Sequence, residues 1–238
     1  AQSVTTSSSS MTASPWAQQV PFDISAEGQK FNFVTGMGGW SWDEFAYKQR
    51  NWVGKENLGI ARIGFLGRNS TGSSLASSLS DGQKASLDTE LANITETGVK
   101  NVLLLCDMDP DSSGKLTESS WVGGLFTSTS AKNRRNYYVN DMALAVQYVE
   151  SKGYKVVAVA PFNEPDYDAL GNCGRSAKAF NVVAEAMQGN ATLKGRVFGP
   201  NTLNSSEGKT WYGTVKNNIN WVNTHQLDGS FDDLVTFW

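Results

Sequence analysis

Apolar runs and amphipathic stretches alternate along most of the chain. Strands are predicted at residues 30–39, 59–67, 100–110, 154–166, 195–204 and 220–227. Helices are predicted at residues 43–53, 81–98, 133–153, 176–187 and 209–216, and from residue 231. The clearest helix is 133–153, where one face at helical spacing carries Tyr138, Met142, Ala145, Val146 and Val149. In the helix at 81–98, Asp81 is the predicted N-cap and Gly98 the stop signal.

This alternation of strands and helices predicts an α/β protein with a parallel sheet. The strands lack an in–out alternation, which is typical of strands covered on both faces. A doubly wound sheet usually carries a glycine-rich phosphate loop after its first strand. Here "GMGGW" lacks the required spacing, and Leu203 stands where a nucleotide-binding Walker motif needs glycine. A (β/α)8 TIM barrel is the alternative that remains.

Polar, acidic and aromatic residues follow one predicted strand after another. They are Trp40, Trp42, Asp43, Arg68, Asn69, Asp107, Asp109, Asn163, Glu164, Asn201, Asn204, His225, Gln226 and Asp228. In a barrel the carboxyl ends of all strands meet at one face, which holds the active site. We therefore predict a (β/α)8 barrel, of which this chain supplies about six βα units.

Glu164 is the leading candidate for chemistry. It ends an apolar strand, and Pro165 is expected to hold it in an extended backbone conformation. The chain has one histidine, His225, which excludes a multi-histidine metal site, and no G-x-S-x-G nucleophile motif is present. Catalysis would therefore rest on carboxylates, without metal or cofactor. The alternative is a solvated loop glutamate that only ends a strand.

The segment "APFNEPD", residues 160–166, resembles the fourth-strand Asn-Glu-Pro motif of clan A glycoside hydrolases. Together with "GMGGWSWDE" it resembles glycoside hydrolase family 30 most. The resemblance implies a retaining enzyme in which Glu164 is the acid/base and Asn163 binds the sugar 2-hydroxyl. It places Arg62 beside the nucleophile and His225 against substrate or nucleophile.

The resemblance also implies a nucleophilic glutamate at a seventh strand, for which this sequence offers no match. We expect a second chain or a C-terminal fragment to complete the barrel, unless the chain is a truncated form. Carboxylates within the chain that are candidates for the role are Asp43, Glu44, Asp107, Asp109 and Asp228. Asp107 and Asp109 fit a loop or sugar-binding role better.

Trp40 and Trp42 are the main aromatic candidates for substrate binding. They lie two residues apart, so on an extended segment both side chains face the same way. Each ring would stack on a sugar, or alternatively pack at the rim of the barrel.

Composition and terminal features favour an extracellular protein. Residues 1–20 form a Ser/Thr-rich arm that resembles a mature N-terminus, and residues 21–238 form the N-terminal part of the barrel. Four glycosylation sequons are present, at Asn69, Asn93, Asn190 and Asn204. Cys106 and Cys173 form one disulfide in an oxidising compartment, or remain two buried thiols. A net charge of −3 without a basic cluster argues against nucleic acid or a membrane as partner.

The sequence therefore predicts a secreted glycosidase that cleaves a β-linked polysaccharide internally with retention of configuration. A catalytically inactive carbohydrate-binding protein on the same fold is the main alternative. A nucleotide-binding α/β protein is a third reading, which binding of ATP or NAD would reveal.

Overall fold

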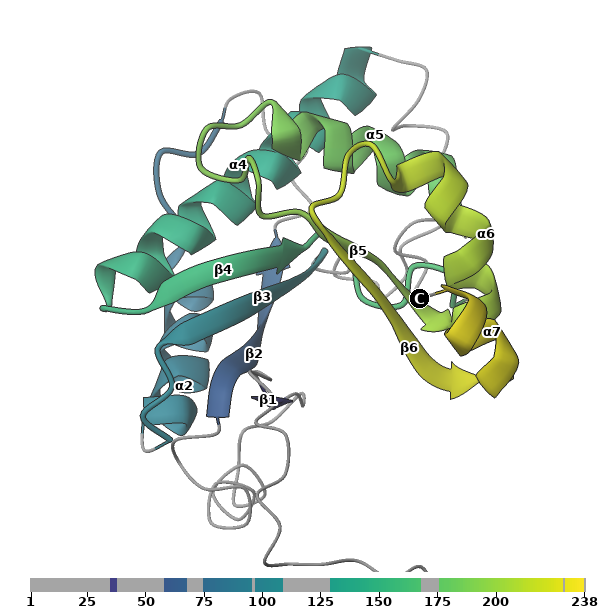
Figure 1. Cartoon of the computed structure of the whole chain (residues 1–238). Helices are drawn as coiled ribbons and strands as arrows, with labels where there is room; N and C mark the ends of the chain where they lie inside the picture. Colours follow the sequence, from purple (N-terminus) through teal and green to yellow (C-terminus); the bar gives the residue numbers. More distant parts are fainter. Residues whose placement is uncertain are drawn as a thin grey trace, which may run out of the picture. The chain divides into compact units, whose positions relative to one another are not determined.

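Strands and helices alternate along the chain in the computed structural model (Figure 1). The structure describes residues 35–37, 58–67, 75–95, 97–108, 129–167, 176–228 and 230–237. The strands are β1 (Thr35–Met37), β2 (Leu58–Gly67), β3 (Asn101–Met108), β4 (Lys155–Ala160), β5 (Phe198–Asn204) and β6 (Trp221–Asp228). The helices are α2 (Asp81–Thr95), α4 (Thr129–Ser151), α5 (Ala177–Gln188), α6 (Ser205–Val215) and α7 (Phe231–Phe237). All six predicted strands are found, and the helix predicted at 43–53 lies outside the described residues.

The strands are parallel and lie side by side in the order of the chain. One sheet has the order β1-β2-β3-β4, and β5 pairs with β6 in a second sheet. A parallel bridge between Val159 and Val197, with a 2.7 Å hydrogen bond from the Val159 N–H to the Arg196 carbonyl, links β4 to the start of β5. A doubly wound sheet reverses its strand order at a switch point, and the described strands show no such reversal. The prediction of a parallel α/β sheet is therefore confirmed, in the form of strands that follow one another in a single direction.

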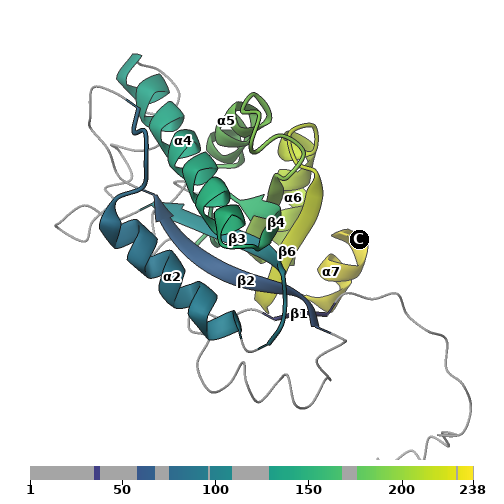
Figure 2. The ribbon, with the colours of Figure 1, turned by 90° about the vertical axis from the view of Figure 1, so that its left-hand side faces the viewer.

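The helices pack on one face of these strands (Figures 1 and 2). Along β2, Ala61, Ile63 and Phe65 are buried in the core, whereas the intervening Arg62 is only half-buried. In the described structure β2 therefore has one fully covered face, and the expected coverage of both faces is wrong for this strand. The predicted apolar face of α4 is confirmed, since each of its five residues is at most 1% exposed. No helix within the described ranges combines the length and the apolar character that crossing a membrane requires.

Side chains cap the first turns of α2 and α6, and both caps differ from the sequence prediction. At α2 the Gln83 N–H donates to Ser80 Oγ at 3.2 Å, and the Ser80 N–H donates to Gln83 Oε1 at 3.0 Å. This reciprocal capping box makes Ser80 the N-cap, so the assignment of Asp81 is wrong by one residue. Gly98 does end the α2 segment, with a positive φ of 75°. Helix α6 begins at Ser205 rather than Lys209, because Asn204 Oδ1 accepts from the Glu207 N–H at 2.9 Å.

Candidate active site

The two residues that follow β4, Pro161 and Phe162, are fixed by contacts with helices α4 and α5. The Tyr138 hydroxyl on α4 donates to the Pro161 carbonyl. The Phe162 ring is fully buried, with its centroid 5.7 Å from that of Tyr138 and 6.1 Å from that of Phe180 on α5. Truncating such a buried aromatic ring typically costs about 3–5 kcal/mol. Asn163 and Glu164 therefore follow directly on a rigid base, which is what a precise site needs.

The backbone of Glu164 adopts a left-handed conformation. Its φ is 46°, so the prediction of an extended conformation is wrong. Pro165 disfavours the right-handed helical region for Glu164. Among the remaining backbone conformations, two hydrogen bonds of Glu164 select the left-handed one. The Glu164 N–H donates to the Asn201 carbonyl at 3.1 Å, and the Glu164 carbonyl accepts from the Tyr167 N–H at 2.9 Å. A residue other than glycine in this region costs about 1–3 kcal/mol, and such strained residues cluster at functional sites.

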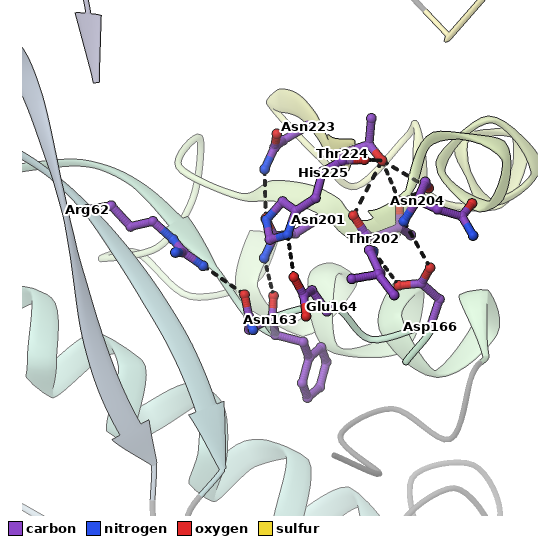
Figure 3. Close-up of polar contacts among 12 residues, drawn as sticks. Arg62, Asn163, Glu164, Asp166, Asn201, Thr202, Asn204, Asn223, Thr224 and His225 are labelled. Carbon is purple, nitrogen blue, oxygen red and sulfur yellow. Dashed lines mark hydrogen bonds and ion pairs between the residues drawn. The ribbon is translucent and has the colours of Figure 1, made fainter. Parts of the chain in front are cut away.

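The Glu164 side chain points toward His225 on β6 (Figure 3). Glu164 Oε1 lies 2.7 Å from His225 Nδ1, although 61 residues separate them in the chain. The two side chains are 15% and 20% exposed, so both are largely buried but still accessible to solvent. His225 was expected to contact the substrate or the nucleophile. In the structure it contacts Glu164, the residue predicted as the acid/base.

Asn201, near the end of β5, joins this pair to the rest of the sheet. Its Nδ2 donates to the Phe162 carbonyl at 2.8 Å, and its Oδ1 accepts from Asn223 Nδ2 at 2.7 Å. The same Oδ1 lies 3.0 Å from His225 Nε2. Asn201 is 1% exposed, and its φ of 59° is one that asparagine tolerates better than most residues. The sequence showed Asn201 only as a polar residue at a strand exit, without a role.

A hydrogen bond between Arg62 of β2 and Asn163 adds β2 to this group of polar side chains. Arg62 Nη2 donates to Asn163 Oδ1 at 2.7 Å, between residues 101 positions apart in the chain. Asn163 is only 3% exposed. Four predicted site residues thus lie together, from within β2, from the exit of β4 and from within β6. With two asparagines they form what we call the site cluster: Arg62, Asn163, Glu164, Asn201, Asn223 and His225 (Figure 3).

A second group of polar side chains lies beside the site cluster, and we call it the support cluster: Asp166, Thr202, Asn204 and Thr224 (Figure 3). Asp166 Oδ1 accepts from the Leu203 N–H at 2.7 Å. The Thr202 and Thr224 hydroxyls lie 2.7 Å apart, and the Thr202 hydroxyl donates to the Asn204 carbonyl at 2.9 Å. A Cβ on Gly208 of α6 would lie 2.9 Å from Thr202 Oγ1, so this helix approaches the cluster closely only because residue 208 is glycine. These contacts join the β4 exit, β5, β6 and α6.

Other predicted substrate-binding residues are not placed by the structure. Trp40 and Trp42 lie outside the described residues. Asp107 lies in β3 opposite Leu66 of β2, and only its backbone is described. The remaining candidate nucleophiles are Asp43, Glu44 and Asp109, which lie outside the described residues, and Asp228, of which the backbone ends β6. The nucleophile, expected outside this chain, therefore stays a prediction.

The structure describes four of the six predicted modification sites. Asn93 is exposed on α2, and Asn190 follows α5 with its Oδ1 accepting from the Thr192 N–H at 2.9 Å. Asn204 caps α6 within the support cluster. Cys106 is fully buried in β3, whereas Asn69 and Cys173 lie outside the described residues. Glycosylation and the disulfide thus remain predictions.

The site cluster suits proton transfer at a polar ligand. A carboxyl in contact with an imidazole can give and take a proton, and the neighbouring amide and guanidinium can bind hydroxyl groups. In the part of the chain that the structure describes, no three His, Cys, Asp or Glu side chains gather as a metal site.

Comparison with known proteins supports the fold assignment. No family model matches the sequence, and no curated protein matches it either. Among solved structures, the chain is similar to a glycoside hydrolase family 30 subfamily 8 xylanase from Clostridium acetobutylicum, with a TM-score of 0.51 and 15% identity over 79% of this chain and 48% of that one. At this identity the likeness concerns the fold, and at that level it confirms the resemblance to family 30 that the motifs predicted.

Two further structures are similar at lower scores. The catalytic domain of a family 30 xylanase C from Talaromyces cellulolyticus has a TM-score of 0.46 and 14% identity over 74% of this chain and 46% of that one. An endo-β-1,6-glucanase has a TM-score of 0.48 and 12% identity over 77% of this chain and 48% of that one. The chain spans about half the length of the structures it matches.

Proposed function

We propose that the protein is a retaining glycoside hydrolase that cleaves β-linked bonds within a polysaccharide. The observation that carries the proposal is the 2.7 Å contact between Glu164, which follows β4, and His225 of β6, with Arg62 and Asn163 beside it. Glu164 is the proposed acid/base, and the site cluster contains the groups that hold and transfer the proton.

In the first step Glu164 protonates the glycosidic oxygen, while a carboxylate from outside the described residues attacks the anomeric carbon. The bond to the leaving sugar breaks and a covalent glycosyl–enzyme forms. Glu164, now ionised, then removes a proton from water, which attacks the same carbon and releases the sugar. Two inversions give net retention, and they require the two carboxyl groups to lie about 5–5.5 Å apart.

Asn163 and Arg62 act on the sugar next to the cleaved bond. Because Asn163 Oδ1 accepts from Arg62, the amide is held in one orientation, with its NH2 group as the donor toward the sugar 2-hydroxyl. A hydrogen bond to this hydroxyl that strengthens in the transition state supplies part of the catalysis.

The architecture proposed for this site is a (β/α)8 barrel. The single direction of the strand order and the likeness to the bacterial xylanase support it. We further propose secretion, on the basis of the sequons, and a partner chain or C-terminal segment that contributes the remaining strands and the nucleophile. The substrate is a polysaccharide or oligosaccharide.

The test is a polysaccharide screen with the full-length protein and a matched pair of glutamate variants. Glu164→Gln keeps the size and the hydrogen-bonding capacity of the side chain but removes the proton that it donates. We expect hydrolysis of a β-glucan, xylan or β-galactan to fall by about 10²–10⁴-fold, the usual contribution of a general acid. Glu185→Gln, which alters an exposed glutamate on α5, should leave the rate unchanged.

Circular dichroism and urea unfolding of both variants check that the fold is intact. Near-normal turnover by Glu164→Gln would remove the central claim. Binding of a polysaccharide by the unaltered protein without hydrolysis would instead support the inactive carbohydrate-binding alternative.

A further inference from the structure

We propose that Asn201 is a positioning residue that keeps a proton on Nε2 of His225, so that Glu164 and His225 share one proton between Oε1 and Nδ1. The proposal rests on the proposed function in one respect: the shared proton takes part in catalysis only if Glu164 is the acid/base. The placement of the proton itself follows from three hydrogen bonds and does not depend on activity.

The orientation of the Asn201 amide is fixed by its neighbours. The Phe162 carbonyl can only accept a hydrogen bond, so the Asn201 atom that lies 2.8 Å from it must be the NH2 group. Oδ1 is then the atom that faces Asn223 Nδ2 at 2.7 Å and His225 Nε2 at 3.0 Å. The amide cannot flip without losing the hydrogen bond to Phe162. At 1% exposure, water does not replace that bond.

This orientation determines where His225 carries its proton. An amide oxygen only accepts, so the contact with Nε2 is a hydrogen bond only when Nε2 is protonated. In the neutral imidazole the lone pair then lies on Nδ1, which faces Glu164 Oε1 at 2.7 Å. That contact requires one proton, carried either by the carboxyl group or by Nδ1 of an imidazolium. Both forms contain the same number of protons, so they differ only in which atom holds the shared one.

Loss of the shared proton leaves the pair in an unfavourable state. If Nε2 keeps its proton, the Nδ1 lone pair faces the ionised carboxylate. If the remaining proton moves to Nδ1, the Nε2 lone pair faces Asn201 Oδ1 at 3.0 Å. Either way one hydrogen bond becomes a contact between two acceptors. Asn201 therefore favours the form that still holds its proton, which is the form that protonates the leaving oxygen.

Figure 3 shows two further charged side chains near the pair, and both have other partners. Arg62 on β2 donates to Asn163 at 2.7 Å. Asp166, in the segment after β4, accepts from the Leu203 N–H at 2.7 Å and lies 3.5 Å from the Asn204 N–H. These charges stay the same in the Asn201 variant below, so they do not contribute to a difference between that variant and the unaltered protein.

The first experiment reads the tautomer directly. His225 is the only histidine of the 238-residue chain, so ¹⁵N-histidine labelling of the full-length protein reports on it, with the signal assigned by its loss in His225→Gln. While the pair holds its shared proton, we expect Nε2 of the unaltered protein to carry a proton. An unprotonated Nε2 in that state would overturn the proposal, without any need for a variant.

One substitution at Asn201 sharpens the test. Glycine suits its φ of 59°, so Asn201→Gly removes the acceptor without imposing a new backbone conformation. In Asn201→Gly the Nδ1-protonated tautomer should gain at least tenfold over the other at alkaline pH. An unchanged tautomer ratio in Asn201→Gly would contradict the proposal.

The second experiment separates this inference from the proposed function. In Asn201→Gly the deprotonated pair has a stable form, so the alkaline limb of the kcat/KM profile should move to lower pH by about one unit, the effect of one hydrogen bond. If the unaltered protein hydrolyses no polysaccharide, the proposed function fails while the NMR result still decides the tautomer. An active protein whose alkaline limb does not move in Asn201→Gly would overturn the inference alone.

Discussion

Asn201 and Thr202 are neighbours on β5, yet they belong to two clusters that use hydrogen bonds differently. In the site cluster most contacts join one side chain to another, as between Glu164 and His225 at 2.7 Å. In the support cluster most contacts join a side chain to the backbone, as between Asp166 and the Leu203 N–H at 2.7 Å. Thr202 is fully buried, whereas His225 is 20% exposed.

This difference indicates a structural role for the support cluster and a chemical role for the site cluster. A backbone amide keeps its proton during a reaction, so the contacts of the support cluster fix the positions of β5, β6 and the β4 exit. A carboxyl and an imidazole exchange protons, so the contacts of the site cluster can change during a reaction. Substitutions in the support cluster should therefore lower stability, and those in the site cluster should lower the rate.

The largest effect is expected from His225→Phe. This change keeps a ring on β6 but removes both nitrogens, so Glu164 loses the partner with which it shares a proton. We expect kcat/KM on a responsive polysaccharide to fall by about 10²-fold, the lower end of what general acid–base catalysis contributes. Steady-state kinetics of the purified full-length variant measure it. A rate within a factor of two of the unaltered protein would show that His225 only fills space.

Thr202→Val should show the opposite behaviour. Valine has nearly the shape of threonine but leaves the Asn204 carbonyl and the Thr224 hydroxyl without their partner at this position. The expected loss is about 1–3 kcal/mol of unfolding free energy, with kcat/KM of the folded protein unchanged. Urea unfolding measures the loss, and the double variant Thr202→Val/Thr224→Val should cost less than the sum of the two single changes. A large fall in rate without a fall in stability would erase the distinction between the clusters.

The smallest effect on stability is expected from a substitution at Glu90 on α2, a half-buried carboxyl. Its Oε2 is buried and has no hydrogen-bond partner in the structure as described, and burial raises its pKa from 4.5 to about 7. Below pH 4.5 the carboxyl is protonated in both the folded and the unfolded state, so Glu90→Gln should be neutral. Between 4.5 and 7 the unfolded chain releases the proton while the folded protein keeps it, so stability falls as pH rises, and above 7 the loss is complete.

Glu90→Gln removes this loss and should stabilise the protein above pH 7 by about 1 kcal/mol, a value kept low because the side chain is only half-buried. Urea unfolding at pH 4 and pH 8 measures it. Equal stabilisation at both pH values would show that the gain has no connection with ionisation.

Periodicity predicted the strands and helices well because each has its own apolar pattern. The face of α4 with Tyr138 and Met142 is buried as predicted, and the order of the strands follows from short connections. The N-cap of α2 and the start of α6 were predicted wrongly, because the capping residues Ser80 and Asn204 were not recognised in the sequence. Ser80 with Gln83 and Asn204 with Glu207 were readable as capping pairs, and this signal outranks the position of the first acidic residue.

The site was only partly predictable. The motif at Asn163 and Glu164 identified one strand exit, and the single histidine and Arg62 were found by resemblance. The left-handed backbone of Glu164 was missed because it depends on a hydrogen bond to Asn201, 37 residues later in the chain. The role of Asn201 was missed for the same reason: its partners come from β4 and β6, and no local pattern encodes them.

The central claim is that Glu164 serves first as an acid and then as a base in a retaining mechanism. The most direct measurement uses Glu164→Ala with the 2,4-dinitrophenyl β-glycoside of the sugar released in the polysaccharide screen, with and without sodium azide. Dinitrophenolate leaves without protonation, so the first step survives, and azide replaces water without needing a base. We predict that azide accelerates turnover and that the product is the β-glycosyl azide. No acceleration by azide, or an α-glycosyl azide as product, would contradict the account.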